Sequence, residues 1–345
     1  MQAPLRSKSK RPVKISIRQV AERANVSHAT VSRVLNNVNV PIAPETRQLV
    51  RDIAAQLGYQ PNRAARALAT GRTQTIALWT TNLRSAYYGD MIHYTHEEVI
   101  RHDYELLVSS VPVYDSPSQS ATKLLSWPVD GLLGVDLPRG VIPALNGSFI
   151  GDLPFVNIGA YVRTTADYVQ VDFRGQALEA IRHLTSVGCK QIAYVVPDWF
   201  DWFREADDAR LGGYEVGVAE TRQEPIYIKT YDSQRESVAE PLNAYIDAYG
   251  CPDGLFFYND DMAIGAYSTL HARGLRVPED VALVGCDGIR DTKYVIPSLT
   301  TIVQPLSMMC ETAWRFLKRR IDEPSLPLQQ RILQPRLDIR ESSLR

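Results

Sequence analysis

The chain opens with three short segments whose apolar residues recur at helical spacing. In the first segment, the residues that share one helix face are Ile17, Val20, Ala21 and Ala24. Ser16 and Gln19 have the spacing of a capping box at its start, and Ser27 is the expected N-cap of the second segment. Two helices joined by only three to four residues predict a helix-turn-helix.

A third helix would complete this small bundle. Pro44 at the first helical position and Glu45 in the first turn favour a helix start. Gly58 is the expected end of the helix. The predicted inner face consists of Val50, Ile53, Ala54 and Leu57.

The second segment, "VSHATVSRVLN", leaves a polar face uncovered. Val31, Val34 and Leu35 have the spacing to face the bundle. The residues that would then face outwards are His28, Ala29, Ser32 and Arg33. Small residues at the start of an exposed helix allow it to enter a DNA major groove, where Arg33 can donate two hydrogen bonds to guanine. Hydroxyl groups that can bond phosphates belong to Ser27, Thr30 and Ser32.

From Thr75 onward the pattern changes to apolar runs that alternate with amphipathic helical segments. The apolar runs are 75–81, 104–111, 131–136, 155–160, 191–197, 226–232, 254–260 and 281–287. The helical segments between them include 87–103, 173–188, 236–250 and 261–274. Continuous apolar strands separated by helices predict two doubly wound α/β subdomains with parallel sheets. Ligands bind beyond the carboxyl ends of such strands, so two facing subdomains would form a cleft.

Charge divides the chain in the same place. The net charge is only −1, but residues 1–75 hold 13 Lys or Arg and three acids, whereas the rest holds 25 bases and 36 acids. A basic head on an acidic body indicates a polyanionic partner for the head. Because no apolar run is long enough to span a bilayer and the basic N-terminus lacks a signal-peptide core, we expect a cytoplasmic, nucleoid-associated protein without membrane contact.

The sequence offers little support for catalysis or metal binding. The four cysteines are scattered without a CxxC pair, which favours reduced thiols in a protein without a metal or other cofactor. No phosphate-binding loop, GxSxG elbow or HExxH helix is present, and the glycines of "RLGGYEVG" do not follow a strand. The rival classes are a sugar-processing enzyme with a basic tail and a solute-binding protein, and both are less well supported than a regulator.

The segments "ISIRQVAERANVSHATVSRVLN" and "PETRQLVRDIAAQLGYQPNRAARALATGRT" resemble the DNA-binding head of the LacI family of bacterial transcription regulators. The resemblance implies a homodimeric repressor on a near-palindromic operator, with His28 and Arg33 as the main base readers. It also implies a weak cap at Ala43, where the family often has Ser. With the hydroxyl residues above, the expected DNA contacts in the head are Ser27, His28, Ala29, Thr30, Ser32, Arg33, Asn36 and Tyr59.

The segment "PNRAARALATGRT" that follows is too short to form a stable isolated helix. By itself it is typical of a linker. It resembles the family's hinge helix, which folds on operator DNA and enters the minor groove. The resemblance implies that Leu68 is an apolar wedge between base pairs. It places Asn62, Ala65 and Ala69 at the flanking minor-groove positions.

The body resembles the family's periplasmic-binding-protein-like core, most strongly in "DARLGGY", "YNDDMAIGA" and "GLRVPEDVALVGCDGIRDTKYVIPSLTTIVQP". The implied organisation is a basic tail at 1–14, a helix-turn-helix domain at 15–60, a hinge at 61–74 and an effector-binding and dimerisation core at 75–345. Within the core, the N-terminal subdomain would comprise 75–172 and 303–331. The C-terminal subdomain would comprise 173–302 and 332–345.

The resemblance also implies effector-binding residues just beyond the strands. Arg210 matches an arginine that clamps the effector, and its fork-shaped guanidinium suits ligand oxygens. Asp287 matches an acidic acceptor, with helix capping as the alternative, and Asn259 matches a polar contact. The neighbouring pair Asp260 and Asp261 is expected to cap the helix that follows rather than to bind a metal.

Aromatic residues complete the expected site and leave the ligand class open. Tyr87, Tyr88 and Tyr231 match ring-stacking positions, and Trp202 lies in the aromatic loop "PDWFDWFREADDAR". Ring stacking favours a carbohydrate effector. However, Gly159 stands where sugar-responsive members often have Asp. Arg204 stands where purine-responsive members have a second arginine, so a purine or nucleoside is the alternative.

Overall fold

The computed structural model describes residues 15–36, 40–59, 67–68, 70–110, 128–137, 153–160, 166–198 and 208–345. The chain forms two compact units, Met1–Thr73 and Gln74–Arg345, referred to below as the head and the core. Within the described ranges, no helix is long and apolar enough to cross a membrane.

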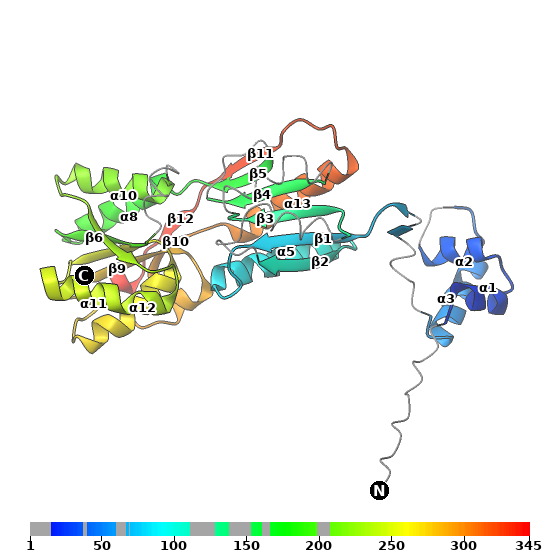
Figure 1. Ribbon diagram of the computed structural model, residues 1–345, viewed down its shortest axis with the longest axis horizontal. Helices are drawn as coiled ribbons and strands as arrows, with labels where there is room; N and C mark the ends of the chain where they lie inside the picture. The colour runs from blue at the N-terminus through cyan, green and yellow to red at the C-terminus, as the bar shows by residue number, and fades with distance from the viewer. Residues whose placement is uncertain are drawn as a thin grey trace, which may run out of the picture. The chain divides into compact units, whose positions relative to one another are not determined.

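The head is a bundle of α1 (Ile17–Ala24), α2 (His28–Leu35) and α3 (Pro44–Gln56) (Figure 1). The predicted capping box is present, because the Ser16 amide donates to Gln19 Oε1 at 2.8 Å and the Gln19 amide donates to Ser16 Oγ at 3.4 Å. Ser27 Oγ accepts the Thr30 amide at 3.0 Å and caps α2. The expectation of a weak cap at Ala43 is confirmed, since α3 begins with a proline and no side-chain cap.

The core of the head is small and consists of short aliphatic side chains. Val20, Val31, Val34 and Val50 are fully buried, with 0% of their surface exposed. The other buried members of this core are Ala21, Ala24, Ile53 and Ala54. Each buried valine contributes on the order of 1.5–3 kcal/mol relative to an exposed one. Because so few apolar side chains are buried, the loss of one of them should remove a large part of the stability of the head.

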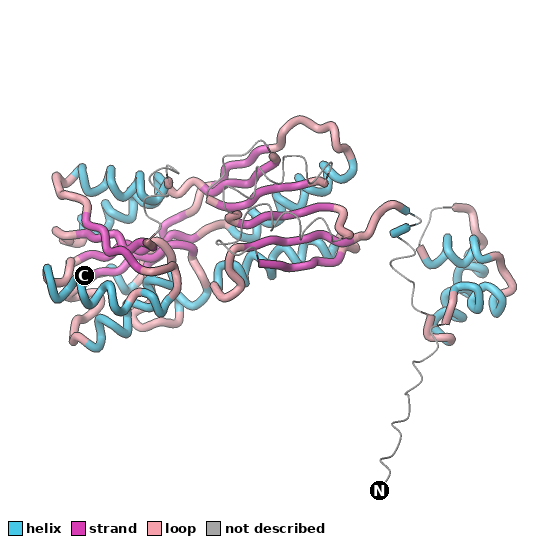
Figure 2. The backbone as a smooth tube through the Cα atoms, viewed as in Figure 1, coloured by secondary structure: helices cyan, strands magenta, loops and turns pink. Residues whose placement is uncertain are grey.

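The core unit contains two six-stranded sheets (Figures 1 and 2). The N-terminal subdomain has the strand order β11-β5-β4-β3-β1-β2, with every described pair parallel. Its strands are β1 (Thr75–Thr80), β2 (Glu105–Ser110), β3 (Gly131–Val135), β4 (Phe155–Gly159), β5 (Asp167–Val171) and β11 (Gln330–Leu333). Two neighbouring helices, α5 (Ala86–Arg101) and α13 (Leu306–Asp322), pack on this sheet.

The C-terminal subdomain has the strand order β12-β10-β9-β8-β6-β7. Its strands are β6 (Ile192–Pro197), β7 (Ile226–Thr230), β8 (Gly254–Phe257), β9 (Ala282–Asp287), β10 (Thr300–Val303) and β12 (Arg336–Asp338). Only the β10–β12 pair is antiparallel among those described. Its helices are α8 (Arg174–Ser186), α10 (Ala209–Glu220), α11 (Ala239–Tyr249) and α12 (Asp260–Ala272), and the short 3-10 turns are Arg235–Ser237, Arg290–Lys293 and Glu341–Ser343.

The helices of this subdomain cover both faces of its sheet, with α8 and α10 on one side and α11 and α12 on the other (Figure 1). The glycines of "RLGGYEVG" allow α10 to approach α8 closely. A Cβ at Gly213 would lie 2.5 Å from the Arg174 carbonyl oxygen, and one at Gly217 would lie 2.7 Å from Ile181 Cβ. The glycine-rich segment is therefore a helix-packing surface.

The chain crosses between the two sheets after β5, after β10 and after β11. Ile332 and Leu333 pair with β5, so the N-terminal sheet extends two residues beyond the expected limit at 331. At the start of β11, the buried carboxylate of Asp167 accepts hydrogen bonds from Arg320 at 2.8 and 3.0 Å. It also accepts the Gln329 amide at 2.8 Å.

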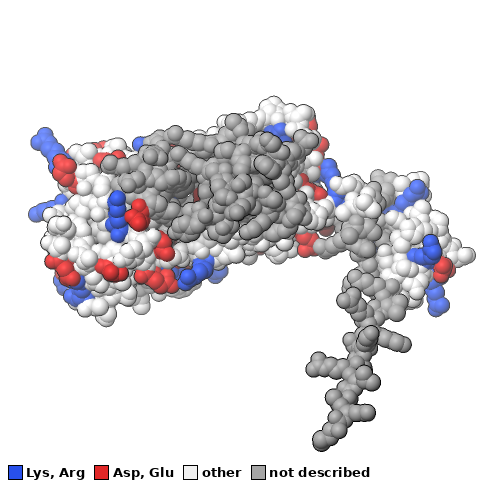
Figure 3. Space-filling view, viewed as in Figure 1, with Lys and Arg blue, Asp and Glu red and all other residues white. Residues whose placement is uncertain are grey.

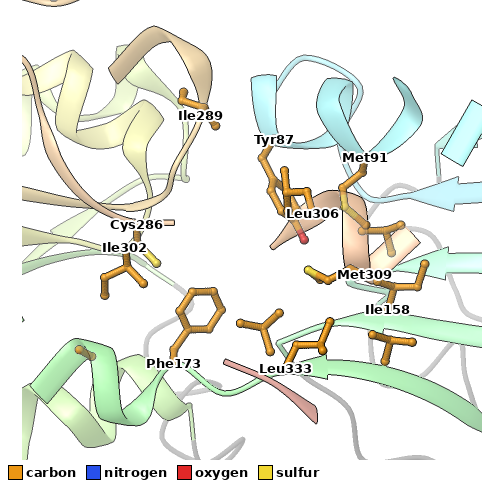
Figure 4. Close-up of a cluster of buried hydrophobic side chains, with 14 of the residues drawn as sticks. Tyr87, Met91, Ile158, Phe173, Cys286, Ile289, Ile302, Leu306, Met309 and Leu333 are labelled. Atoms are coloured by element: carbon orange, nitrogen blue, oxygen red, sulfur yellow. The ribbon is translucent and has the colours of Figure 1, made fainter. Parts of the chain in front are cut away.

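One continuous apolar cluster reaches from one subdomain into the other. Tyr87 and Met91 from α5 lie near Leu306 and Met309 from α13, and Phe173 lies at the crossing after β5 (Figure 4). All five side chains are buried, with at most 7% of their surface exposed. The two subdomains therefore share a core beside the region where their strands end.

Candidate effector cavity and DNA-reading surface

A cavity of about 350 Å³ lies at the carboxyl ends of both sheets. The N-terminal subdomain contributes Thr81 after β1, Asp136 after β3 and Ala160 after β4. The C-terminal subdomain contributes residues 232–234 after β7, residues 258–259 after β8, and Asp287 and Gln304 at the ends of β9 and β10. This is where open parallel sheets bind ligands, and the volume lies within the usual range of about 300–1,000 Å³.

Arg210 lies in the first turn of α10, lines the cavity and is only 4% exposed. Its guanidinium carbon lies 4.1 Å from the ring centre of Tyr258 and 4.8 Å from that of Phe173. One terminal nitrogen donates to the Tyr258 carbonyl oxygen at 3.2 Å, and the other lies 3.5 Å from the buried Asp208 carboxylate. Aromatic faces and a buried ion pair therefore hold the guanidinium in place at the cavity wall.

Two carboxylates face the same cavity from opposite sheets. Asp287 accepts a hydrogen bond from Gln304 Nε2 at 2.9 Å, and burial raises its pKa well above the usual range, with the neighbouring Asp260 acting in the same direction. Asp136 accepts the Ala160 amide at 3.1 Å, and burial also raises its pKa. The charge of Arg210 opposes both increases. Both groups can accept hydrogen bonds from a ligand.

Asp260 lies behind Asp287 and shapes the loop after β9. It is fully buried and accepts the Gly288 and Ile289 amides at 2.6 and 2.9 Å, and the Thr301 hydroxyl at 2.6 Å. These bonds support the unusual backbone of Asp287, whose φ is +125°. Burial raises the pKa of Asp260 to about 7.

The expectation that Asp260 and Asp261 cap α12 is wrong. The cap is Asn259, whose Oδ1 accepts the Met262 amide at 2.8 Å while its Nδ2 donates to the Ser233 carbonyl at 3.1 Å. Asp261 instead accepts Ser85 Oγ at 2.8 Å from the N-terminal subdomain and Arg235 Nε at 2.7 Å. Of these residues, Ser85, Ser233 and Asn259 line the cavity.

Tyr87 and Tyr88 both line the cavity from the start of α5. Their rings form an edge-to-face pair with centres 4.9 Å apart. The Tyr88 hydroxyl accepts Thr81 Oγ1 at 2.6 Å, and burial raises the pKa of both phenols well above the usual range. They therefore act as neutral hydrogen-bonding rings.

The structure brings five of the eight expected effector residues to one cavity, namely Tyr87, Tyr88, Arg210, Asn259 and Asp287. It does not bring Tyr231 there, because this ring is 64% exposed and its hydroxyl bonds Glu240. Trp202 and Arg204 lie outside the described residues. Sequence reasoning missed Asp136, although it follows an apolar strand as Asp287 does. Other cavity residues that it missed are Phe173, Tyr258 and Gln304.

In the head, α2 presents one exposed face formed by His28, Ala29 and Arg33. Its opposite face buries Val31 and Val34. Ser32 lies beside the exposed face and accepts Asn36 Nδ2 at 3.3 Å. On the face of the molecule drawn in Figure 3, by contrast, acidic and basic side chains are interspersed over the C-terminal subdomain. The head thus has an uncovered helix face suited to a groove.

The other expected DNA contacts differ in their surroundings. Ser27 and Thr30 share a hydrogen bond between their hydroxyls at 2.8 Å, while Tyr59 is half-buried against the bundle. The Leu68 side chain is 90% exposed. Asn62, Ala65 and Ala69 lie outside the described residues.

Comparison with known proteins decides the family. Residues 16–62 match the family model described as bacterial regulatory proteins, lacI family, and residues 181–343 match the periplasmic binding protein-like domain. The chain is 30% identical over 338 residues to the HTH-type transcriptional repressor PurR of Klebsiella pneumoniae (strain 342), covering 95% of this chain and 96% of the relative. The chain belongs to the LacI family.

Further relatives agree with this assignment. Catabolite control protein A of Staphylococcus xylosus is 29% identical over 333 residues, covering 92% of this chain and 97% of the relative. The lac repressor dimer bound to operator and the anti-inducer ONPF is 24% identical and has the same fold, with a TM-score of 0.84 over 96% of this chain and 100% of that chain. The complex of the transcriptional regulator CelR with cellobiose is 25% identical, with a TM-score of 0.68 over 95% of this chain and 100% of that chain.

The protein is accordingly a DNA-binding transcription regulator with an effector-binding core, and it is not an enzyme. The expected architecture is confirmed as a helix-turn-helix head followed by two parallel-sheet α/β subdomains. Repressors of this family bind operator DNA and small-molecule effectors.

Proposed function

We propose that this regulator is a homodimeric repressor that binds a near-palindromic operator and is released from it by a small carbohydrate. The observation that carries this proposal is the cavity at the strand ends, which combines the buried Arg210 with acidic and aromatic residues. Sugars present hydroxyl groups at the ring edge and apolar C–H faces, so they suit both kinds of lining residue. The likeness to the CelR–cellobiose complex supports the same class.

In this proposal Arg33 reads a guanine in the major groove, and His28 contacts a neighbouring base edge. The hydroxyls of Ser27, Thr30 and Ser32 position α2 on phosphates, with Asn36 and Tyr59 beside them. Leu68 acts as the minor-groove wedge. Its 90% exposure supports that role, because an unpartnered leucine gains apolar contacts when it enters a base step.

The effector is held by Arg210 and Asp287, with Asn259, Tyr87 and Tyr88 around it. Arg204 and Trp202 remain candidates for the same ligand. A nucleoside is the second candidate, supported by the tyrosine rings that line the cavity, since they can stack on a base as well as on a sugar. Because both subdomains line the cavity, a ligand that bridges them fixes their relative angle and thereby acts on DNA binding.

The test is calorimetry of the full-length protein with carbohydrates and nucleosides, in the presence and absence of operator DNA selected from a random pool. An inducing sugar weakens operator binding, and linkage requires the operator to weaken sugar binding by the same factor, typically about 5–150-fold. Arg210→Ala should lose sugar binding and keep operator binding. The matched control is Arg182→Ala, which removes an exposed arginine paired with Glu220.

Each alternative predicts a distinct result. If only nucleosides bind, the second candidate replaces the carbohydrate. If the sugar tightens operator binding, the regulator is of the corepressor type. Sugar affinity that is unchanged in Arg210→Ala would place the effector elsewhere.

A further inference from the structure

Asp136 occupies an unusual position at the end of β3. It is not a glycine, yet its φ is +47°, and its own amide donates to the Ile158 carbonyl at 2.9 Å. This backbone directs the carboxylate across the end of the neighbouring strand β4, where Oδ1 accepts the Ala160 amide at 3.1 Å. The Tyr87 hydroxyl also bonds this carboxylate. The side chain is thus held at the cavity wall by groups from two other elements.

Gly159, at the end of β4, leaves the space that this carboxylate fills. Its φ of +139° favours glycine. A Cβ at position 159 would overlap Asp136 Oδ1 and would lie only 2.8 Å from Asp136 Cγ. Positions 136 and 159 therefore depend on each other, because only one of them can project a side chain into this corner of the cavity.

The charges around the cavity are unequal. Among its described lining residues, Asp136, Asp232 and Asp287 are acidic and Arg210 is the one base. The Arg210 guanidinium already faces the buried Asp208 carboxylate, at 3.5 Å. Asp208 thus neutralises much of the positive charge of Arg210. A ligand meets carboxylate oxygens from both subdomains in surroundings where charges are weakly screened.

We propose that Asp136 and Gly159 form a specificity pair, in which Asp136 selects ligands that donate hydroxyl or ammonium hydrogens and rejects phosphorylated ones. The proposal rests on the proposed function and narrows it to neutral or amino sugars. A sugar hydroxyl donates a charge-assisted hydrogen bond to Asp136, while Asp287 accepts another from the opposite side. A phosphate in the same cavity brings about 1.5 to 2 negative charges close to the Asp136 carboxylate.

The first experiment measures selectivity by calorimetry on the full chain. The probes are glucose, ribose, cellobiose and glucosamine, compared with glucose 6-phosphate and ribose 5-phosphate. The phosphorylated sugars should bind at least about 100-fold more weakly than the best neutral or amino sugar. Asp136→Asn keeps the shape of the side chain but removes its charge, so it should weaken the best sugar about 10-fold and strengthen its phosphate by a similar factor.

Asp247→Asn is the matched control, because this aspartate is exposed on α11 and pairs with Arg273. Its selectivity should equal that of the wild type. A phosphorylated sugar that binds wild type better than its parent overturns the specificity pair. Unchanged selectivity in Asp136→Asn overturns it too. Failure of all the carbohydrate probes to bind wild type contradicts the proposed carbohydrate function itself, and the narrower inference falls with it.

The second experiment tests the pair without any ligand. Gly159→Ala should lower the melting temperature of the core by about 2–10 °C, because the new methyl group overlaps the carboxylate. In the background of Asp136→Gly, which suits the φ of +47°, the same change should cost less than half as much. The backbone penalty at position 159 is common to both backgrounds, so the difference measures the overlap alone. Equal losses in both backgrounds would show that the two positions are independent.

Discussion

The head and the core place their functional surfaces in opposite ways. The exposed face of α2 comes from one helix of eight residues, and the bundle that supports it is built from neighbouring segments. The cavity collects residues from Thr81 to Gln304, which are brought together by parallel strands that end at one place. A surface on a single helix follows from local periodicity, whereas a cavity between sheets follows only from the topology of the whole core.

The largest effect is expected from a substitution that unfolds the head and leaves the core folded. Val50→Asp places a carboxylate in a core of eight apolar side chains, none of which can pair with its charge. Burial of an unpaired charge should exceed the stability of the head. Operator binding should be abolished, while the thermal transition of the core and sugar binding stay unchanged. Calorimetry and fluorescence anisotropy give the two measurements.

The control is Leu49→Asp, at the adjacent position, where the leucine side chain is 47% exposed. This variant should keep the head folded. A fall in the core transition caused by Val50→Asp would contradict the independence of the two units.

A change of pH should alter the stability of the core by a smaller amount. Burial raises the pKa of Asp287 and raises that of Asp260 to about 7, both above the value of an unfolded chain near 3.9. At a pH between about 4 and about 7, these two carboxyl groups therefore bind protons more tightly in the folded core than in the unfolded chain. Its free energy of unfolding should fall as the pH rises from about 4 to about 7, by on the order of 1.4 kcal/mol for each pKa unit.

Urea unfolding at pH 5, 6 and 7 measures this dependence. Asp287→Asn should flatten it, because the variant no longer titrates at that position and retains an oxygen for Gln304. Asp247→Asn, at an exposed site, should behave as wild type does. A core that becomes more stable across this pH range would contradict the prediction.

A substitution on α2 should have a moderate effect confined to DNA. Arg33→Ala should cost about 1–3 kcal/mol on the selected operator and much less on random DNA, because it removes the proposed contact to base edges. Competition binding at fixed salt measures both. Arg23→Ala, an exposed arginine at the end of α1, is the charge-matched control. Equal losses on both DNAs would mean that Arg33 contacts only phosphates.

The smallest change in folding energy is expected at the hinge. Leu68→Ala removes a side chain that is 90% exposed, so the free energies of unfolding of head and core should change by less than about 0.5 kcal/mol. Operator bending should nevertheless decrease, because the proposed apolar wedge is lost. Fluorescence energy transfer across labelled operator DNA measures the bend. An unchanged bend would remove Leu68 from the DNA interface.

Several elements were predictable from sequence because their pattern is local. The capping box at Ser16 and Gln19 and the fully buried strand 254–257 follow from spacing and from continuous apolar residues. Strand β5, with the sequence "DYVQV", alternates buried and half-buried residues and lacks a continuous apolar run. The edge strands β11 and β12 are short and contain one buried residue between them, so they have no comparable pattern.

Local sequence patterns also identified only some of the residues that line the cavity. Asp287 was expected as an acceptor from a motif, while Asp136 stands after an equally clear strand and was not singled out. Its importance depends on Gly159, which lies on another strand, and no pattern along the chain joins the two. The roles of Asp260 and Asp261 were wrong for a related reason: their partners Thr301 and Ser85 are far away in sequence.

Synthesis from the N-terminus makes β11 and β12 the last of the described strands to appear. Until residues 329–338 have left the ribosome, both sheets lack an edge strand, and Asp167 lacks the Gln329 amide that helps to hold it. The head needs only its own three helices, so it can fold much earlier. A partly synthesised chain can therefore complete its helix-turn-helix head before either sheet of the core has all of its strands.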